Sequence, residues 1–424
     1  MRVLLISANT ERINILPLPL GLNCVAVAAR NAGHEVKLVD LMTEKDDQSS
    51  LRNIVADFNP EIIGISVRNI DDQNMENPRF LLDQVKKVVA ECRNISGVPI
   101  ILGGAGYSIF PESALRYLEA DIGIQGEGET VFPILLDRIE RGANISGVPG
   151  VYLPDSGLQG KRFFEKNLDR LPPSDPYILS LSAPDKQECW MPLQTRRGCP
   201  MGCSYCSTAT IEGRTIRKRS TEYFIKEITS HVGVGFQRFY FVDNIFNIPE
   251  TYAKEICRAI IKSGLVLSWR CIIYPWRLDK ELIHLMAEAG CTEVSLGFES
   301  GCERILHTMN KRYTIDDVRQ TSDMLRDAGI KRLGFLLLGG PGETRESVQE
   351  SLAFADSLNL DALKITIGIR IYPYTALAKI AVKEGLIRPE DNLLFPTFYI
   401  ASNLRNWIRD TVLLWIANRP HWMF

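Results

Sequence analysis

The thiols of Cys199, Cys203 and Cys206 are the groups in this sequence whose spacing most directly implies chemistry. They stand four and three residues apart, so one short loop can bring all three onto a single small inorganic cluster. A cubane 4Fe-4S cluster held by three thiolates keeps one iron open for a substrate or cofactor, whereas an electron-carrying site normally has a fourth thiolate. Pro200 and Gly202 suit such a loop, because proline fixes one backbone angle and glycine permits an unusual one.

Two other uses of these cysteines have weaker support. A zinc site needs a second closely spaced pair of ligands, and outside the cluster region no two of the ten cysteines lie within ten residues of each other. Disulfides are disfavoured because the first residues, MRVLLISANTERIN, do not resemble a signal peptide, which indicates a reducing cytoplasm.

The composition is that of a soluble globular protein. Of the 424 residues, 45% are hydrophobic and 24% are charged, and a formal net charge of −2 gives no reason to bind nucleic acid. The one dense basic run, 214–219, is either a solvated helix start or a contact for phosphate or a reductase. No apolar stretch is long enough to span a bilayer.

Residues 1–145 alternate between short apolar runs and amphipathic segments. The apolar runs suit buried parallel strands and are Val3 to Ser7, Val36 to Asp40, Ile62 to Val67, Ile100 to Gly103 and Asp121 to Ile124. Amphipathic segments at 20–32, 81–92 and 111–120 lie between them. The alternation predicts a Rossmann-like (flavodoxin-like) parallel sheet, which binds ligands at the carboxyl ends of its strands.

The predicted carboxyl ends of these strands carry glycines and polar side chains. The candidate ligand contacts among them are Ser66, Arg68, Gly103, Gly104, Gly106, Gly126 and Glu127. Glycines there let the backbone approach a ligand closely, and a helix N-terminus nearby accepts phosphate. Taken alone, the sheet is equally consistent with a scaffold that binds no large cofactor.

The cysteine motif carries a family resemblance. CxxxCxxC with an aromatic residue, Tyr205, just before the last cysteine resembles the signature of the radical S-adenosylmethionine (radical SAM) superfamily. In that superfamily the open iron chelates the amino and carboxylate groups of the methionine moiety. One electron from the cluster then cleaves the sulfonium and yields a 5′-deoxyadenosyl radical that abstracts hydrogen.

Residues 191–386 show a second strand and helix alternation. Its predicted strands are Met191 to Arg197, Arg238 to Asn244, Ser268 to Tyr274, Glu293 to Phe298, Arg332 to Leu338 and Leu363 to Ile371. Six such units resemble the partial (β/α)6 barrel of radical SAM proteins. The proline-rich residues 146–190 are predicted to be an ordered linker. Residues 387–424 are predicted to be a helical cap over the open side of the barrel, in preference to a membrane-surface helix.

The resemblance extends to the ends of the later strands. It implies contacts to S-adenosylmethionine from Tyr205, Asp243, Asn244, Glu299, Ser300 and Gly339, within or near the stretches FVDN, GFESG and GGPGET. FVDN lacks the glycines of the superfamily, and Glu343 with Thr344 would cap a helix with or without a ligand. Arg270 and Arg277 are candidates for the methionine carboxylate, for an anionic substrate or for salt bridges.

With the cluster motif downstream, the first segment resembles the cobalamin (B12)-binding domain in front of many radical SAM barrels. PLGL, AGHEVKLVD, IIGISV, LGGAG and GEGE occur in the expected order, and Ser66 with Gly103-Gly104 corresponds to elements that line the nucleotide tail. The Asp-x-His-x-x-Gly element that elsewhere supplies the lower cobalt ligand is missing, and His34 should lie at the amino end of the sheet. The resemblance therefore implies a cobalamin without histidine ligation.

The leading function is C-methylation of an unactivated carbon by a cobalamin-dependent radical SAM enzyme in the cytoplasm. The resemblance implies a small-molecule or lipid substrate and a reductase such as flavodoxin or ferredoxin. Tyr372 and Tyr374, after the sixth predicted strand, could donate a hydrogen or proton or could fill a core. Radical cyclisation or rearrangement without methyl transfer stays open, as does a sensor that binds cobalamin and S-adenosylmethionine without turnover.

Overall fold

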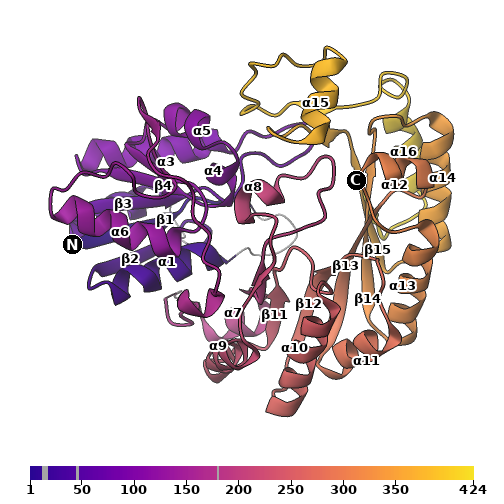
Figure 1. Cartoon of the computed structure of the whole chain (residues 1–424), viewed down its shortest axis with the longest axis horizontal. Helices are drawn as coiled ribbons and strands as arrows, with labels where there is room; N and C mark the ends of the chain where they lie inside the picture. The colour runs from indigo at the N-terminus through magenta and orange to yellow at the C-terminus, as the bar shows by residue number, and fades with distance from the viewer. Residues whose placement is uncertain (12–17, 44–46, 179–180) are drawn as a thin grey trace.

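The computed structural model describes residues 1–11, 18–43, 47–178 and 181–424. Figure 1 shows two α/β units side by side, the first in indigo and magenta and the second in pink to orange. Each is built on a sheet whose strands are mainly parallel. This architecture confirms the predicted fold class.

The first sheet has the strand order β2-β1-β3-β4-β5-β6-β7. Its parallel strands are β1 (Arg2–Ser7), β2 (Glu35–Asp40), β3 (Ile62–Ser66), β4 (Ile100–Gly103) and β5 (Ile122–Ile124). The antiparallel strands β6 (Val151–Leu153) and β7 (Gly157–Leu158) continue it. The segment predicted as a linker thus begins by extending the first sheet, and its residues 179 and 180 lie outside the described residues.

Helices cover both faces of this sheet. They are α1 (Leu20–Asn31), α2 (Asp47–Phe58), α3 (Leu82–Ile95), α4 (Ala105–Ile109), α5 (Pro111–Leu118) and α6 (Gly128–Glu140). Because side chains alternate along a strand, Val3 and Leu5 pack with α1 and α6, while Leu4 and Ile6 pack with α2, α3 and α5. The sequence analysis did not predict α2 or α6, since α2 begins in a polar run and α6 contains Pro133.

The second sheet has the order β18-β15-β14-β13-β12-β11-β8 and is parallel throughout. Its strands are β8 (Met191–Leu193), β11 (Arg238–Phe241), β12 (Ser268–Ile273), β13 (Cys291–Glu299), β14 (Lys331–Leu338), β15 (Ala362–Ile367) and β18 (Trp422–Met423). Its main helices are α9 (Thr221–Gly233), α10 (Glu250–Ser263), α11 (Lys280–Glu288), α12 (Glu303–Thr308), α13 (Ile315–Asp327) and α14 (Arg345–Ser357). The six strands from β8 to β15 form the predicted partial barrel.

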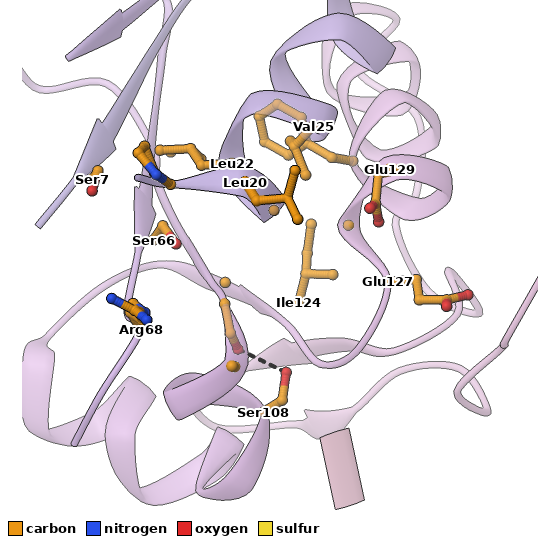
Figure 2. A pocket seen from close by; sticks show the side chains of 18 of the residues that line it. Ser7, Leu20, Leu22, Val25, Ser66, Arg68, Ser108, Ile124, Glu127 and Glu129 are labelled. Atoms are coloured by element: carbon orange, nitrogen blue, oxygen red, sulfur yellow. Dashed lines mark hydrogen bonds between the residues drawn. The ribbon is translucent and has the colours of Figure 1, made fainter. Parts of the chain in front are cut away.

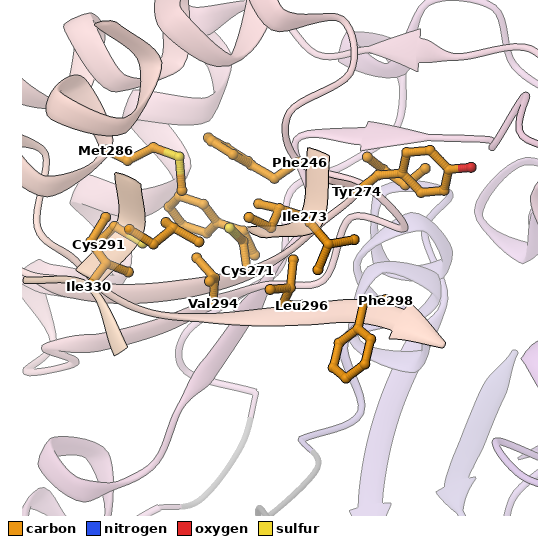
Figure 3. Close-up of a cluster of buried hydrophobic side chains, with 14 of the residues drawn as sticks. Phe246, Cys271, Ile273, Tyr274, Met286, Cys291, Val294, Leu296, Phe298 and Ile330 are labelled. Carbon is orange, nitrogen blue, oxygen red and sulfur yellow. The ribbon is translucent and has the colours of Figure 1, made fainter. Parts of the chain in front are cut away.

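Alternation along β12 separates the core of the barrel from its inner face. Trp269, Cys271 and Ile273 are buried, and Figure 3 shows Cys271 and Ile273 within the apolar cluster between sheet and helices. Arg270 and Ile272 point the other way and are only partly buried. The inner face therefore keeps accessible side chains for chemistry.

Short elements complete the chain. They are α7 (Ala183–Glu188), β9 (Arg196–Arg197), α8 (Thr208–Glu212), β10 (Arg217–Lys218), β16 (Ile369–Arg370), α15 (Ala376–Lys383), β17 (Phe398–Tyr399) and α16 (Ile408–Ile416). Helix α16 packs against α14, and Arg419 behind it pairs with Asp356 on α14 at 2.5 Å. This placement on the outer face differs from the predicted cap over the open side of the barrel. None of the described helices is long and apolar enough to cross a membrane.

Candidate active site

A cavity of about 360 Å³ opens at the carboxyl edge of the first sheet (Figure 2). Leu20 and Val25 on α1 and Phe132 on α6 give it an apolar wall, while Gln194 and Val242 of the second unit close its far side. Of the predicted ligand contacts, those that line it are Ser66, Arg68, Gly103, Gly104, Gly126 and Glu127. The structure thus brings these six residues together around one cavity and adds the wall contributed by the barrel.

Two glycine-rich turns form the rim of the cavity. Gly104 has φ +103°, and a Cβ there would lie 2.5 Å from the Val67 carbonyl oxygen, so only glycine fits. Gly106 packs against the Arg68 carbonyl and does not line the cavity, so it shapes the turn instead of contacting a ligand as predicted. Ser108 joins the turns: its Oγ donates to the Gly104 carbonyl (2.8 Å) and accepts from the Gly126 N–H (3.0 Å).

The lining fits a flat, largely apolar group with a polar edge, as in the nucleotide tail of cobalamin. Ser66 and Ser108 add hydroxyl groups to the apolar wall. The residues that line this cavity include no histidine, and cobalamin without histidine ligation stays a prediction. His34 lies at the amino end of the sheet, where its Nδ1 is 3.4 Å from the Met1 amino group.

Buried ion pairs connect the cavity rim to the barrel. Arg197 on β9 pairs with Glu127 at 3.1 Å and with Glu129 at 2.6 Å, and Arg217 on β10 pairs with Glu127 at 2.5 Å. Burial acts to raise the pKa of Glu129, but the charge and hydrogen bond of Arg197 outweigh it and hold that pKa below its usual range. The Glu127 carboxylate, predicted to contact cobalamin, is occupied by these arginines and therefore joins the two units.

The loop 199–206 follows Arg197 directly. Gly198 has φ +90°, and a Cβ there would overlap the Thr215 carbonyl oxygen. A second segment, 309–313, holds the loop from the other side. Ser204 N–H donates to the Met309 carbonyl (3.0 Å) and Asn310 Nδ2 donates to the Gly202 carbonyl (2.7 Å). The cysteine loop is thus anchored at its entry and along its length.

The three cysteines share this loop, but their side chains are not gathered as a ready metal site. Among the described residues, no three His, Cys, Asp or Glu side chains are grouped to hold a metal ion, so cluster ligation stays a prediction. Burial raises the pKa of Cys199 to about 11 and also raises the pKa of Cys203, where Lys311 acts in the opposite direction. Iron binding at neutral pH must therefore displace thiol protons.

Lys311 lies between two predicted S-adenosylmethionine contacts. Its Nζ is 3.0 Å from Tyr205 Oη and 3.3 Å from Glu299 Oε1, and only 4% of its side chain is exposed. Glu299 itself adopts φ +61°, a left-handed backbone that ends the long strand β13. The structure therefore brings Tyr205 and Glu299 together beside Cys203, through a lysine that sequence analysis missed because it stands alone in a loop.

Asp243 follows β11, as predicted, and its carboxylate has partners within the protein. Its carboxylate is fully buried, accepts N–H bonds from Thr195 (2.8 Å) and Arg196 (3.1 Å), and lies 3.2 Å from the Arg196 guanidinium. Burial raises the pKa of Asp243, and Arg196 acts against that rise. With its acceptors engaged, Asp243 fixes the strand that leads to the cysteine loop and does not present a free contact for S-adenosylmethionine.

Other predicted contacts serve local structure. Asn244 Nδ2 donates to Glu212 at 2.5 Å, and Ser300 Oγ is buried 3.0 Å from Ser351 Oγ. The Gly339 and Gly340 N–H groups both donate to one oxygen of Glu343, whose other oxygen has no hydrogen-bond partner among the described residues. The turn that carries the predicted S-adenosylmethionine contact Gly339 is therefore organised around a buried carboxyl group.

Arg270 is the polar centre of the inner barrel face. Its guanidinium stacks between the Trp190 and Tyr240 rings, with centroids at 4.5 and 4.8 Å, and lies 3.3 Å from Glu293. Its Nε and Nη2 are buried and have no hydrogen-bond partner in the part of the chain that the structure describes. Such donors suit an anionic group, as predicted for Arg270, whereas Arg277 stacks on Trp276 in a left-handed turn.

Two family models match this chain. The radical SAM superfamily model matches residues 193–355, and the B12 binding domain model matches residues 9–136. The chain belongs to the radical SAM proteins that carry a B12-binding domain. The matched ranges contain the cysteine loop with Glu299 and Lys311, and the cavity rim of the first sheet, respectively.

Relatives of this radical SAM protein include named methyltransferases and named cyclases. An uncharacterised methyltransferase of Pyrococcus horikoshii is 28% identical over 404 residues, which cover 91% of this chain and 84% of that protein. Cytidylyl-2-hydroxyethylphosphonate methyltransferase of Streptomyces wedmorensis is 24% identical, covering 90% and 80%. The radical SAM methyltransferase TsrM of Kitasatospora setae, solved with tryptophan and an S-adenosylmethionine analogue, has the same fold, with a TM-score of 0.87, 22% identity and coverage of 100% and 90%.

The two predicted catalytic tyrosines of this radical SAM protein have different surroundings. Tyr372 is only partly exposed, packs near Phe110 with ring centroids 6.2 Å apart, and lies under the Arg370 guanidinium. Tyr374 is 88% exposed and adopts φ +63°, so it does not fill a core. A catalytic role stays a prediction for both tyrosines.

Proposed function

We propose that this protein is a cobalamin-dependent radical SAM enzyme that methylates an unactivated carbon of a small-molecule or lipid substrate. The observation that carries the proposal is the buried bridge from Arg197 to Glu127 and Glu129. It connects the rim of the cobalamin-type cavity to β9, the short strand just before Cys199. Two cofactor sites are thereby held at a fixed spacing, as a methyl transfer that uses both would require.

Different residues of the chain would have different roles in this reaction. Cys199, Cys203 and Cys206 would hold a 4Fe-4S cluster, while Tyr205 and Glu299 would face S-adenosylmethionine. When bound, the cluster would supply the electron that cleaves S-adenosylmethionine, and methylcobalamin would supply the methyl group. The first unit and the inner barrel face would keep the reacting carbon away from bulk water. The methyltransferases of Pyrococcus horikoshii and Streptomyces wedmorensis match 91% and 90% of this chain, whereas a cyclase of Rubrivivax gelatinosus matches 77%, so the longer matches support methyl transfer.

The electron donor would be a low-potential reductase such as flavodoxin or ferredoxin. All ten cysteines are unpaired in the structure, which suits a reducing compartment such as the cytoplasm. The basic run 214–219 is mostly engaged inside the protein: Arg217 pairs with Glu127, and Arg219 donates to the Leu168 carbonyl at 2.8 Å. Exposed Arg214 and Lys218 are left as the part of that run which a reductase could contact.

The test is anaerobic reconstitution with iron, sulfide, cobalamin and S-adenosylmethionine, followed by reduction with dithionite. 5′-Deoxyadenosine and S-adenosylhomocysteine are quantified for the wild type, for Cys203→Ala and for the control Cys92→Ala, whose cysteine is buried on α3. We expect both products from the wild type and the control, and neither from Cys203→Ala.

Each product reports on a different part of the proposal. Cobalamin-dependent S-adenosylhomocysteine indicates methyl transfer, whereas deoxyadenosine alone indicates cyclisation or rearrangement. A loaded wild-type protein that produces neither would support the sensor alternative and would contradict an enzymatic role.

A further inference from the structure

Lys311 carries an ammonium group buried beside the cysteine loop. Only 4% of its side chain is exposed, and it pairs with the Glu299 carboxylate at 3.3 Å. The rings of Tyr205, Tyr274 and Tyr313 surround the ammonium, with centroids at 5.2, 5.8 and 5.9 Å. A buried charge needs such compensation, because removing it from water is strongly unfavourable.

The surroundings of the ammonium suit a positive charge. The Tyr205 Oη lies 3.0 Å from Nζ and the Glu299 Oε1 lies 3.3 Å from it, and three tyrosine rings pack against the ammonium. Since Tyr205 directly precedes Cys206, Lys311 places this charge beside the cysteine loop.

The backbone around Lys311 fixes that charge relative to the loop. Its neighbours Met309, Asn310 and Arg312 bind the loop at the Ser204 N–H and at the Gly202 and Pro200 carbonyls, the last at 3.4 Å. Arg312 N–H also donates to Tyr274 Oη at 2.9 Å. Since both flanks are anchored, the backbone at Lys311 is held beside the loop.

We propose that Lys311 is a positioning residue that orients Tyr205 and places a fixed positive charge beside the 4Fe-4S cluster, making its one-electron reduction easier. The inference rests on the proposed function, which assigns the cluster to Cys199, Cys203 and Cys206. The electron comes from the external donor and stays on the cluster, which becomes more negative by one charge. A nearby cation stabilises that added charge, and no bond to Lys311 forms or breaks.

The experiment measures the reduction equilibrium of the cluster in the reconstituted full-length protein, without substrate. Samples are poised anaerobically with dithionite and redox mediators, and the reduced cluster is counted by electron paramagnetic resonance. The variants are Lys311→Met and Lys311→Gln, which remove the charge, and Lys311→Arg, which keeps it. Lys331→Met is the matched control, because Lys331 is exposed at the amino end of β14, opposite the cysteine loop.

We expect the neutral variants to lower the reduction equilibrium constant at least tenfold, a shift of about 59 mV for a one-electron couple. The reduction equilibrium constants of Lys311→Arg and Lys331→Met should stay within twofold of the wild-type constant. A neutral variant that loses iron while Lys311→Arg keeps it would also support a charge requirement.

The inference would be overturned if the neutral variants bound the cluster and reduced it with the wild-type equilibrium constant. It would also be overturned if Lys311→Met and Lys311→Arg changed that constant equally. Those results would leave the proposed function intact, because deoxyadenosine and S-adenosylhomocysteine test it separately.

Discussion

Asp71 and Arg370 form a buried ion pair, with 2.7 Å between Asp71 Oδ2 and Arg370 Nε, that joins the two units of the chain. Their side chains are 1% and 2% exposed. Arg370 also donates to the Leu393 and Leu394 carbonyls, at 2.9 and 3.1 Å. The pair holds the loop after β3, which supplies Ser66 and Arg68 to the cavity, against the end of the barrel.

Removing one partner of this pair should be strongly destabilising. Asp71→Ala leaves the Arg370 guanidinium buried without its carboxylate, which typically costs about 3–5 kcal/mol of unfolding free energy. Urea denaturation of the variant and the wild type measures the loss. Asp137→Ala, which breaks an exposed pair of the same length with Arg141, should cost less than about 1 kcal/mol. Equal losses in the two variants would contradict a special role for the Asp71 pair.

Arg197→Met should separate the cavity rim from the cysteine loop. The change leaves Glu129 without its only cationic partner among the described ion pairs, and Glu127 with Arg217 alone. We expect backbone hydrogen exchange at 126–130 and 196–199 to rise at least tenfold. Arg116→Met, which removes an exposed pair with Glu112, is the control. Unchanged exchange in Arg197→Met would show that the units are held together without the bridge.

Gly198→Ala should prevent cluster assembly. A methyl group there would overlap the Thr215 carbonyl oxygen, in addition to straining a backbone at φ +90°. Gly235→Ala separates the steric overlap from the backbone strain, because Gly235 has a similar φ of +104° but open space around its Cβ position. Iron content after reconstitution should fall at least fivefold in Gly198→Ala and stay near the wild-type value in Gly235→Ala. A fully loaded Gly198→Ala would show that the loop can shift freely.

Glu343 should make stability decrease between pH 4.5 and 7. Burial raises the pKa of Glu343 from 4.5 to about 7, so the folded protein binds this proton more tightly than the unfolded chain. Its contribution is fully present below pH 4.5, is lost as pH rises, and amounts to roughly 3 kcal/mol at most. Glu343→Gln removes the titration. The difference in urea midpoint between wild type and Glu343→Gln should change over this range, and parallel pH profiles would contradict the assignment.

Much of the fold could be predicted because it depends on local patterns. The apolar runs of β1 to β5 and of the six barrel strands are short and bounded by turn residues, and Thr314 with Asp317 forms a capping box at the start of α13. Helix α2 was missed because its first residues are polar, and the contact of α16 with α14 was not predicted because periodicity does not state which surface a helix covers.

The candidate site also divides into features that local sequence patterns predict and features that depend on tertiary packing. The cysteine spacing and the glycine-rich strand ends identified the cofactor types, since these depend on residues close together in the chain. Asp243 and Glu127 were assigned to ligands, whereas the structure engages their carboxylates with Arg196 and with Arg197 and Arg217. Whether a carboxylate is free depends on partners that are distant in the sequence.

The sequence by itself therefore determined the two α/β units, the cysteine loop and the family. Only the tertiary structure decided that Lys311 lies between Tyr205 and Glu299, and that Asp71 binds Arg370 from 299 residues away. The physical reason is that strand and helix periods, caps and short motifs act over a few residues. The charge environment of a buried group instead arises when packing removes water and brings distant side chains within hydrogen-bond distance.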